Sequence, residues 1–220
     1  MKAVTSVSRE VVGPLGVNAW FIDCGSGRAA VVDPGGDADS IISHLSALNA
    51  EPSVFFLTHG HFDHLSALPA LKRRWPGVPV AIHPADSEWL GPGAHERHRA
   101  FFEALGCGWM VARYGGDLPA PDILLSDGEA LPGNLIPGMS GWKVLHTPGH
   151  SPGSVCLYNE EFSILVSGDT LFRRGYGRTD GPGGSMDSLS RSLERLFSLP
   201  ASTRVLPGHG EETLVRDEKM

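Results

Sequence analysis

The sequence predicts an α/β fold in which β-sheets are covered on their outer faces by helices. Short apolar runs bounded by glycine and proline alternate along the chain with segments that carry one apolar face at helical spacing. The 220 residues, 41% hydrophobic and 20% charged, have the composition of a globular protein. No stretch has the character of a linker, so we expect a single domain over residues 1–220.

The first third of the chain contains three short apolar runs and one amphipathic segment. Residues 19–23 and 29–32 lie on either side of a glycine-rich turn, and both are expected as strands. Apolar residues then recur at helical spacing over residues 38–48, which predicts a helix with one buried face. Residues 54–57 are all apolar, as is typical of a buried strand, and this strand leads directly into Thr58-His59.

A second helix and a fourth strand follow. Leu68, Leu71 and Trp75 are spaced as on one helical face. Pro69 fits such a helix only in its first turn, where the missing N–H has no partner to lose. Residues 78–82 are expected as the next strand.

The pattern weakens over residues 84–141, which we interpret as a loop-rich insertion or cover beside the functional site. Within this stretch only a helix at residues 94–105 and a short strand at residues 123–125 are indicated, and a further short strand at residues 143–145 follows it. Regular patterning then returns, with strands at residues 155–158, 164–166 and 204–206 and a helix at residues 186–197.

Charge and cysteine content exclude several classes of function. The net charge of −7 and the absence of a long basic run argue against nucleic-acid binding. The first residues, Met1 to Ser6, form no apolar signal core, and no apolar run is long enough to cross a bilayer. The three cysteines form no CxxC pair: Cys24, Cys107 and Cys156. We expect them to be free, buried thiols in a reducing cytosol. We therefore expect a cytoplasmic protein without membrane association.

Four potential metal ligands follow the strand at residues 54–57, in the hexapeptide HGHFDH at residues 59–64. In an extended segment alternate side chains point the same way, so His59, His61 and Asp63 are able to face one cavity. A turn into the following helix would bring His64 beside them. Imidazole and carboxylate together suit zinc or iron. Six residues cannot enclose two ions, and further ligands must come from distant strand ends.

Three distant residues have this setting, because each follows an apolar strand and is flanked by glycine: His150, Asp169 and His209. His146 competes with His150, since it also follows a strand. The turn Pro148-Gly149 favours His150. His83 lies at a strand end too, but we expect a surface or hydrogen-bonded side chain there, and we expect solvated side chains for the helical histidines, including His98.

These motifs resemble a known family. HxHxDH at residues 59–64 is the signature of the metallo-β-lactamase superfamily. Further segments look most like its glyoxalase II (hydroxyacylglutathione hydrolase) branch, in particular short bacterial members: VDPG at 32–35, TPGH at 147–150, GDTLF at 168–172, GRTD at 177–180 and PGHG at 207–210. The resemblance runs from about Val12 to the end of the chain and implies a four-layer αβ/βα sandwich.

The resemblance also implies a dinuclear site. His59, His61 and His150 would bind one metal ion. The second ion would be held by Asp63, His64 and His209. Asp169 would bridge the two ions. Zinc is the expected metal, with iron or manganese as alternatives. Asp33 would support the site from behind the ligands.

The chemistry implied is hydrolysis of a thioester of the S-acylglutathione type, or of a related ester, in a small-molecule substrate. A hydroxide bridging two ions is a strong nucleophile because a bound dication lowers the pKa of water to about 7. Asp63 would orient or deprotonate this water, and Arg178 is a candidate substrate-binding residue. Human-type glyoxalase II enzymes carry a lysine and a tyrosine in this stretch, where this chain has Arg178 and Asp180, and they also have a C-terminal helical domain not expected here.

Other functions remain open. A persulfide dioxygenase uses the same scaffold with a single iron, which His59, His150 and Asp169 would hold. A lactonase or another hydrolase of the superfamily is a further alternative, as is a binding protein with a vestigial site. A β-lactamase is disfavoured because no export signal is apparent and Asp169 supplies a bridging carboxylate. The chain is compatible with a homo-oligomer.

Overall fold

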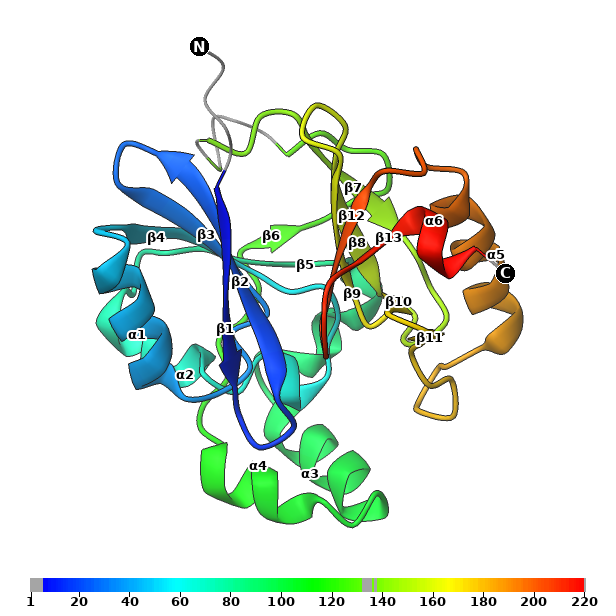
Figure 1. Ribbon diagram of the computed structural model, residues 1–220. Coiled ribbons are helices and arrows are strands. Elements are labelled where there is room, and N and C mark those ends of the chain that lie inside the picture. Colours follow the sequence, from blue (N-terminus) through cyan, green and yellow to red (C-terminus); the bar gives the residue numbers. More distant parts are fainter. Residues whose placement is uncertain (1–5, 132–135, 137, 220) are drawn as a thin grey trace.

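Two β-sheets face each other at the centre of the molecule, as Figure 1 shows for this computed structural model. The structure describes residues 6–131, 136 and 138–219. The expectation of an N-terminus without a signal core therefore falls almost wholly outside the described residues, as does part of the loop expected around Pro132 and Pro137. Among the described helices none is both long and apolar enough to span a membrane.

The first sheet has six strands in sequence order. β1 to β3 pair antiparallel, and β3 to β6 pair parallel because helices connect the strands after β3. β4 begins earlier than expected and includes Pro52, which lies at a register shift opposite Ala29 where a missing N–H is tolerated. The strands are β1 Val7–Val12, β2 Val17–Gly25, β3 Arg28–Val32, β4 Glu51–Phe56, β5 Val80–Ile82 and β6 Ile123–Leu124.

The second sheet has five strands in the order β13-β12-β9-β8-β7. Only β12 and β9 pair parallel within it. A separate hairpin, β10 Leu171–Phe172 with β11 Gly175–Tyr176, follows β9. The sheet strands are β7 Trp142–His146, β8 Val155–Asn159, β9 Ile164–Gly168, β12 Arg204–Pro207 and β13 Thr213–Leu214.

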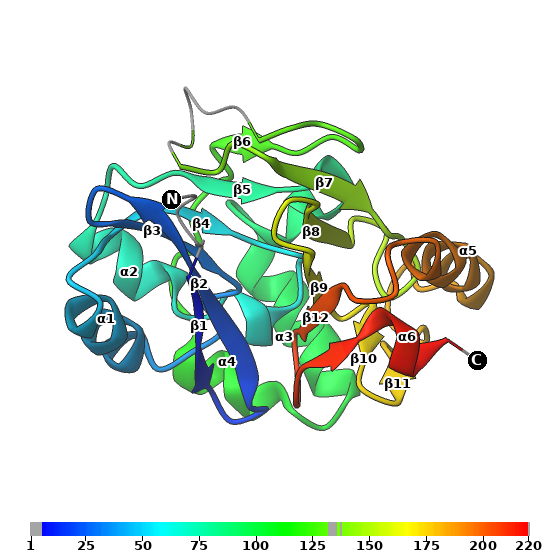
Figure 2. The ribbon, with the colours of Figure 1, turned by 45° about the horizontal axis from the view of Figure 1, so that its top comes forward.

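Three apolar clusters show how the layers form. Alternate residues of β2 to β4, such as Trp20 and Phe56, meet those of the second sheet, such as Trp142, in the space between the sheets. The opposite face of the first sheet packs on α1 Ala38–Ala47 and α2 Leu68–Arg74, and Pro69 lies in the first turn of α2 as expected. The outer face of the second sheet packs on α5 Met186–Phe197 and α6 Val215–Glu218. The predicted αβ/βα sandwich is thereby confirmed (Figure 2).

The stretch 84–141 has more helix than the sequence indicated. It begins with the 3-10 helix η2 Pro84–Trp89 and continues through α3 Ala94–Ala104 and α4 Gly108–Tyr114, which was not expected. Met110 and Val111 of α4 are buried in the cluster beneath the first sheet. Tertiary packing thus fixes a helix of seven residues whose own periodicity is too short to be recognised. α3 and α4 lie side by side below the β1–β2 hairpin in Figure 1.

Candidate metal centre

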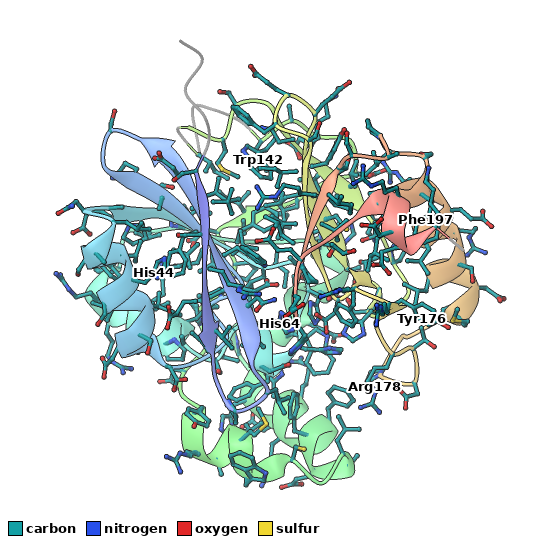
Figure 3. All side chains as sticks on the ribbon, in the orientation of Figure 1. His44, His64, Trp142, Tyr176, Arg178 and Phe197 are labelled. Carbon is teal, nitrogen blue, oxygen red and sulfur yellow. The ribbon has the colours of Figure 1, made fainter. Side chains whose placement is uncertain are left out.

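The seven side chains selected from the sequence come together at one end of both sheets. β4 delivers the chain to the 3-10 helix η1 Phe62–His64, which carries two of them. His150 lies in the loop between β7 and β8, Asp169 directly follows β9, and one residue separates His209 from the end of β12. Figure 3 shows His64 deep between the two sheets and Arg178 toward the periphery. Strand ends therefore aim all seven side chains into one region.

One group consists of His59, His61 and His150. A nitrogen of each imidazole lies within 4.8 Å of the others. The Nε2 atoms of His59 and His150 are 3.3 Å apart, and the ring of His61 is nearly perpendicular to that of His150, with centroids separated by 4.5 Å. Three nitrogens that converge in this way match the ligand set of a zinc ion with one open position.

The second group consists of Asp63, His64 and His209, whose ligand atoms also lie within 4.8 Å of one another. The Nε2 atoms of the two histidines are 3.2 Å apart. Asp63 Oδ2 lies 3.5 Å from Nε2 of His209 and 3.7 Å from Nε2 of His64. This group offers two nitrogens and one oxygen to a second cation.

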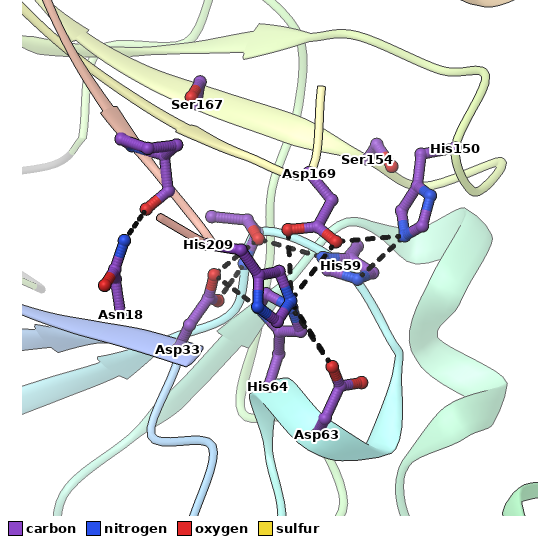
Figure 4. Close-up of polar contacts among 12 residues, drawn as sticks. Asn18, Asp33, His59, Asp63, His64, His150, Ser154, Ser167, Asp169 and His209 are labelled. Carbon is purple, nitrogen blue, oxygen red and sulfur yellow. Dashed lines mark hydrogen bonds and ion pairs between the residues drawn. The ribbon is translucent and has the colours of Figure 1, made fainter. Parts of the chain in front are cut away.

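Asp169 lies between the two groups (Figure 4). Its Oδ1 is 3.4 Å from Nε2 of His64, and its Oδ2 is 3.6 Å from Nε2 of both His150 and His209. Asp169 Oδ1 is buried but makes no hydrogen bond within the described part of the chain. A buried carboxylate oxygen without a donor is costly unless a cation satisfies it, so the residues fit a pair of metal ions.

Electrostatics divide the histidines into two kinds. Burial holds the pKa of His59 well below its ordinary value and, as the largest cause, lowers that of His61 to about 3. Both rings are therefore neutral and have lone pairs for a metal. Burial also acts to lower the pKa of His64, but three surrounding carboxylates, led by that of Asp169, outweigh it and raise this pKa to about 10. In the metal-free protein a proton on His64 thus provides the positive charge that a cation would replace.

Hydrogen bonds behind the ligands fix their orientation. His64 Nδ1 donates to Asp33 Oδ2 over 3.0 Å, and the same carboxylate accepts from the backbone N–H and the hydroxyl of Thr58 over 2.8 and 2.7 Å. His150 Nδ1 donates to the carbonyl oxygen of Arg178 over 2.8 Å. In both histidines the bond at Nδ1 leaves Nε2 directed at the site.

The turn that carries His209 is held by the first sheet. Asn18 of β2 is buried and donates from Nδ2 to the carbonyl oxygens of Pro207 and Gly210, both over 2.9 Å. Gly208 brings the backbone so close to the site that a Cβ atom there would lie 2.2 Å from Asp169 Oδ1. The glycine beside His209 therefore serves a close approach of main chain to ligand.

The competing histidines lie elsewhere. His146 donates from Nε2 to the carbonyl oxygen of Pro152 over 2.9 Å and stacks on His83 with ring centroids 4.0 Å apart. Neither residue is part of the two ligand groups. The expectation of a solvated His98 is wrong, because this ring is fully buried and Nε2 bonds to the carbonyl oxygen of Trp89 over 2.8 Å. The side chain of His98 is buried because η2 packs against α3, the helix that carries it.

A buried carboxylate that the sequence analysis did not select lies beside the first group. Asp86 of η2 accepts hydrogen bonds from the backbone N–H groups of Gly60 and Gly153 and from the hydroxyl of Ser151. No local signal distinguishes Asp86, because it falls in the stretch where the sequence pattern weakens and its partners come from two distant loops.

A cavity of about 310 Å³ opens onto the site. Arg178 lines it, and its guanidinium forms a bidentate pair with Asp180 at 2.6 and 2.8 Å. Residues of both ligand groups line one side of the cavity. The other side is apolar and consists of Leu15, Phe101, Phe102 and Leu105.

Comparison with known proteins identifies the family. The model of the metallo-beta-lactamase superfamily matches residues 12–209. A probable metallo-hydrolase of Bacillus subtilis, YqgX, is 36% identical over 212 residues, which cover 96% of this chain and 93% of the relative. The hydroxyacylglutathione hydrolase GloC of Haemophilus influenzae is 34% identical over 199 residues, which cover 87% of this chain and 84% of the relative.

Two solved structures agree with this fold. The B3 metallo-beta-lactamase BLEG-1 has a TM-score of 0.82 at 33% identity and covers 97% of this chain and 96% of its own. TTHA1623, solved in a di-iron-bound form, has a TM-score of 0.78 at 34% identity and covers 96% of each chain. The family model and the two relatives span most of this sequence. The chain therefore belongs to the metallo-beta-lactamase superfamily, whose members include metal-binding hydrolases.

Proposed function

We propose that the chain is a dinuclear metallohydrolase that cleaves a thioester of the S-acylglutathione type. The observation that carries the proposal is the position of Asp169, whose carboxylate lies against both ligand groups: Oδ2 is 3.6 Å from Nε2 of both His150 and His209, and Oδ1 is 3.4 Å from Nε2 of His64. A carboxylate shared in this way suits two adjacent ions, which in hydrolytic sites lie about 3.5–4 Å apart. The similarity to a hydroxyacylglutathione hydrolase supports the choice of substrate.

The residues would have distinct roles. Bound ions would supply a water of lowered pKa and a Lewis acid for the thioester carbonyl. Asp63 is buried between His64 and His209, and although burial acts to raise its pKa, these imidazoles hold it well below the usual range. Its carboxylate therefore stays ionised, and it would bind the cation while it orients the attacking water. We propose zinc as the metal. Because TTHA1623 was solved in a di-iron-bound form, the metal analysis also includes iron.

A substrate panel combined with metal analysis tests the proposal. Protein purified without chelator is analysed for zinc, iron and manganese and assayed with S-lactoylglutathione, S-acetylglutathione and the β-lactam nitrocefin. Oxygen uptake is followed with glutathione persulfide, because His59, His150 and Asp169 lie together in a set that would also hold a single iron. We expect about two metal ions per chain and thioester cleavage.

Two results would overturn this proposal. Oxygen uptake with persulfide, without thioester cleavage at any metal loading, would establish the dioxygenase. Hydrolysis of nitrocefin alone would point to the activity for which BLEG-1 is named.

A further inference from the structure

The apolar side of the cavity is built by two distant parts of the chain. Leu105 is the C-cap residue of α3, and Leu15 lies in the turn between β1 and β2. These leucines are 37% and 46% exposed although both line the cavity. Phe101 lies one helical turn before Leu105 and places its ring centroid 5.3 Å from that of His61. The apolar wall therefore begins directly beside the first ligand group.

Space next to this wall is kept open by a glycine. A Cβ atom on Gly181 would lie 3.4 Å from the ring of Phe101 and 3.9 Å from Nε2 of His61. Gly181 thus places no side chain of its own between Phe101 and His61. The space beside the first ligand group is therefore available to a group of the substrate.

The cavity offers no free cation to a charged group. Apart from the side chains of the metal centre, among them Asp169, Arg178 is the only charged residue that lines the described cavity. Asp180 accepts from its Nε and from one terminal nitrogen, so the charge of the guanidinium is already paired with a carboxylate. An uncharged, apolar group is the chemistry that such a wall binds best, because burying a charge there would leave it unpaired.

We propose that the wall formed by Leu15, Phe101 and Leu105 binds the acyl group of the substrate and selects apolar acyl chains. This inference rests on the proposed thioester hydrolysis. Each methylene transferred from water to an apolar surface strengthens binding about fourfold. We therefore expect kcat/KM to rise about fourfold per added CH2 until the wall is covered.

The test varies only the acyl chain on one thiol. S-acetyl-, S-propionyl-, S-butyryl- and S-hexanoylglutathione are compared in kcat/KM for the zinc-loaded protein. In the double variant Leu15→Ala and Leu105→Ala the gain per methylene should fall to less than about twofold, because apolar contact is lost. Both side chains are exposed, so the variant should fold.

Leu48→Ala is the matched control, because Leu48 is also an exposed leucine at the C-cap of a helix, that of α1, and lies outside this cavity. It should keep the slope of the unmodified protein. Cleavage of the acetyl thioester with no dependence on chain length would overturn the acyl-chain inference and leave the hydrolase standing. Failure to cleave any thioester would instead overturn the proposed function and the inference with it.

A second inference comes from Asp86 and is independent of the reaction catalysed. Its Oδ2 accepts from the N–H of Gly60, between His59 and His61, over 2.8 Å. The same oxygen accepts from the Ser151 hydroxyl, next to His150, over 2.6 Å, and Oδ1 accepts from the N–H of Gly153, also over 2.6 Å. One carboxylate thus joins the two loops that carry the first ligand group.

The backbone closes tightly around this carboxylate. A Cβ atom on Gly60 would lie 2.4 Å from the Trp89 side chain, and one on Gly153 would lie 2.6 Å from Asp86. Asp86 itself is fully buried, so water cannot replace the bonds if the carboxylate is removed. We infer that Asp86 is a positioning residue that sets the separation of the three histidines in the first ligand group.

Asp86→Asn tests this role through metal affinity. The amide keeps the shape but presents an NH2 group to one of the donors, which loosens one loop. Competition with a chromophoric chelator should show one of the two zinc affinities reduced about 10–100-fold, with the other retained. Ser151→Ala removes one of the same bonds and should have a smaller effect in the same site, which provides a second variant if Asp86→Asn does not fold.

Glu218→Gln is the matched control. Glu218 is also a buried carboxylate that accepts from a backbone N–H, that of Arg174, and from a hydroxyl, that of Thr213, but it lies outside the ligand groups. It should lower thermal stability without changing either zinc affinity. Equal losses at both sites, unchanged affinities, or the same loss in Glu218→Gln would each overturn the positioning role.

Discussion

Replacing Asp33 by asparagine should weaken the second metal ion through the tautomer of His64. The carboxylate accepts three hydrogen bonds, two from Thr58 and one from His64 Nδ1. An asparagine has one acceptor oxygen. If its NH2 group faces His64, the ring must accept at Nδ1 and carry its proton at Nε2, the atom directed at the ion. If the NH2 group instead faces the N–H of Thr58, two hydrogen-bond donors point at each other in a buried position and neither has an acceptor.

The size of the effect follows from these bonds. Loss of an outer partner of a ligand histidine costs about 10–100-fold in metal affinity, or about 1.4–2.7 kcal/mol. Hydrogen bonds to a charged group contribute about 1.5–3 kcal/mol each, and because only part of the set is lost we expect about 2 kcal/mol of folding stability to disappear. For a chain of this length that lowers Tm by about 4–8 °C.

Chelator competition measures the affinity, and thermal unfolding in EDTA measures the stability. Asp122→Asn is the control, because Asp122 also accepts a backbone N–H, from Val80 over 2.8 Å, but is half exposed and outside the site. Zinc affinities of Asp33→Asn within twofold of the unmodified protein would refute the tautomer argument. So would a loss confined to the site of His59, His61 and His150.

Three further predictions concern the ligands. His150→Ala should remove one ion and nearly all thioester turnover, whereas His146→Ala should retain both ions, because His146 bonds to the carbonyl oxygen of Pro152 instead. Elemental analysis measures the metal content of both variants, and the reverse outcome would show that the wrong histidine was chosen. Asp63→Asn should reduce thioester turnover at least about a hundredfold while circular dichroism stays unchanged, since a ligand and the group orienting the water are lost together; turnover within tenfold would exclude that role. In the metal-free protein the pKa of His64 is raised to about 10, above the usual value for an unfolded chain of about 6.5. Its proton therefore stabilises the fold fully below about pH 6.5, and this contribution is lost as the pH rises toward 10. Urea midpoints of the metal-free protein should fall from pH 7 to pH 10, and an unchanged or rising midpoint would contradict this.

Much of the centre could be recognised in the sequence because its signals are local. The hexapeptide at residues 59–64 presents four donors after a buried strand, and alternation correctly places His59 and His61 in one ligand group. Asp63 does not follow this alternation, because it lies in the 3-10 helix η1 and joins the second group. His150, Asp169 and His209 are single residues, but each follows an apolar strand and lies beside a glycine. Such strand ends meet at one edge of a layered α/β fold, so these positions converge in the structure.

The remaining features depend on contacts between segments far apart in the chain. α4 is too short to show a period, and its position is fixed by the burial of Met110 and Val111. Asp86 gains its importance only when η2 brings it between two loops from different sheets. Arg178 is a candidate substrate-binding residue in the sequence, but the fold pairs its side chain with Asp180 and uses its carbonyl oxygen to hold His150.

The division has a physical reason. Ligand identity and strand ends are set by the chemistry and hydrophobic pattern of a few consecutive residues, which a single sequence displays. The tautomer of His64, the tether at Asp86 and the apolar wall from Leu15 to Leu105 each require two or more segments to meet. Such contacts leave no periodic or compositional trace, because hydrogen-bond direction and desolvation act over a few ångströms of space regardless of sequence separation.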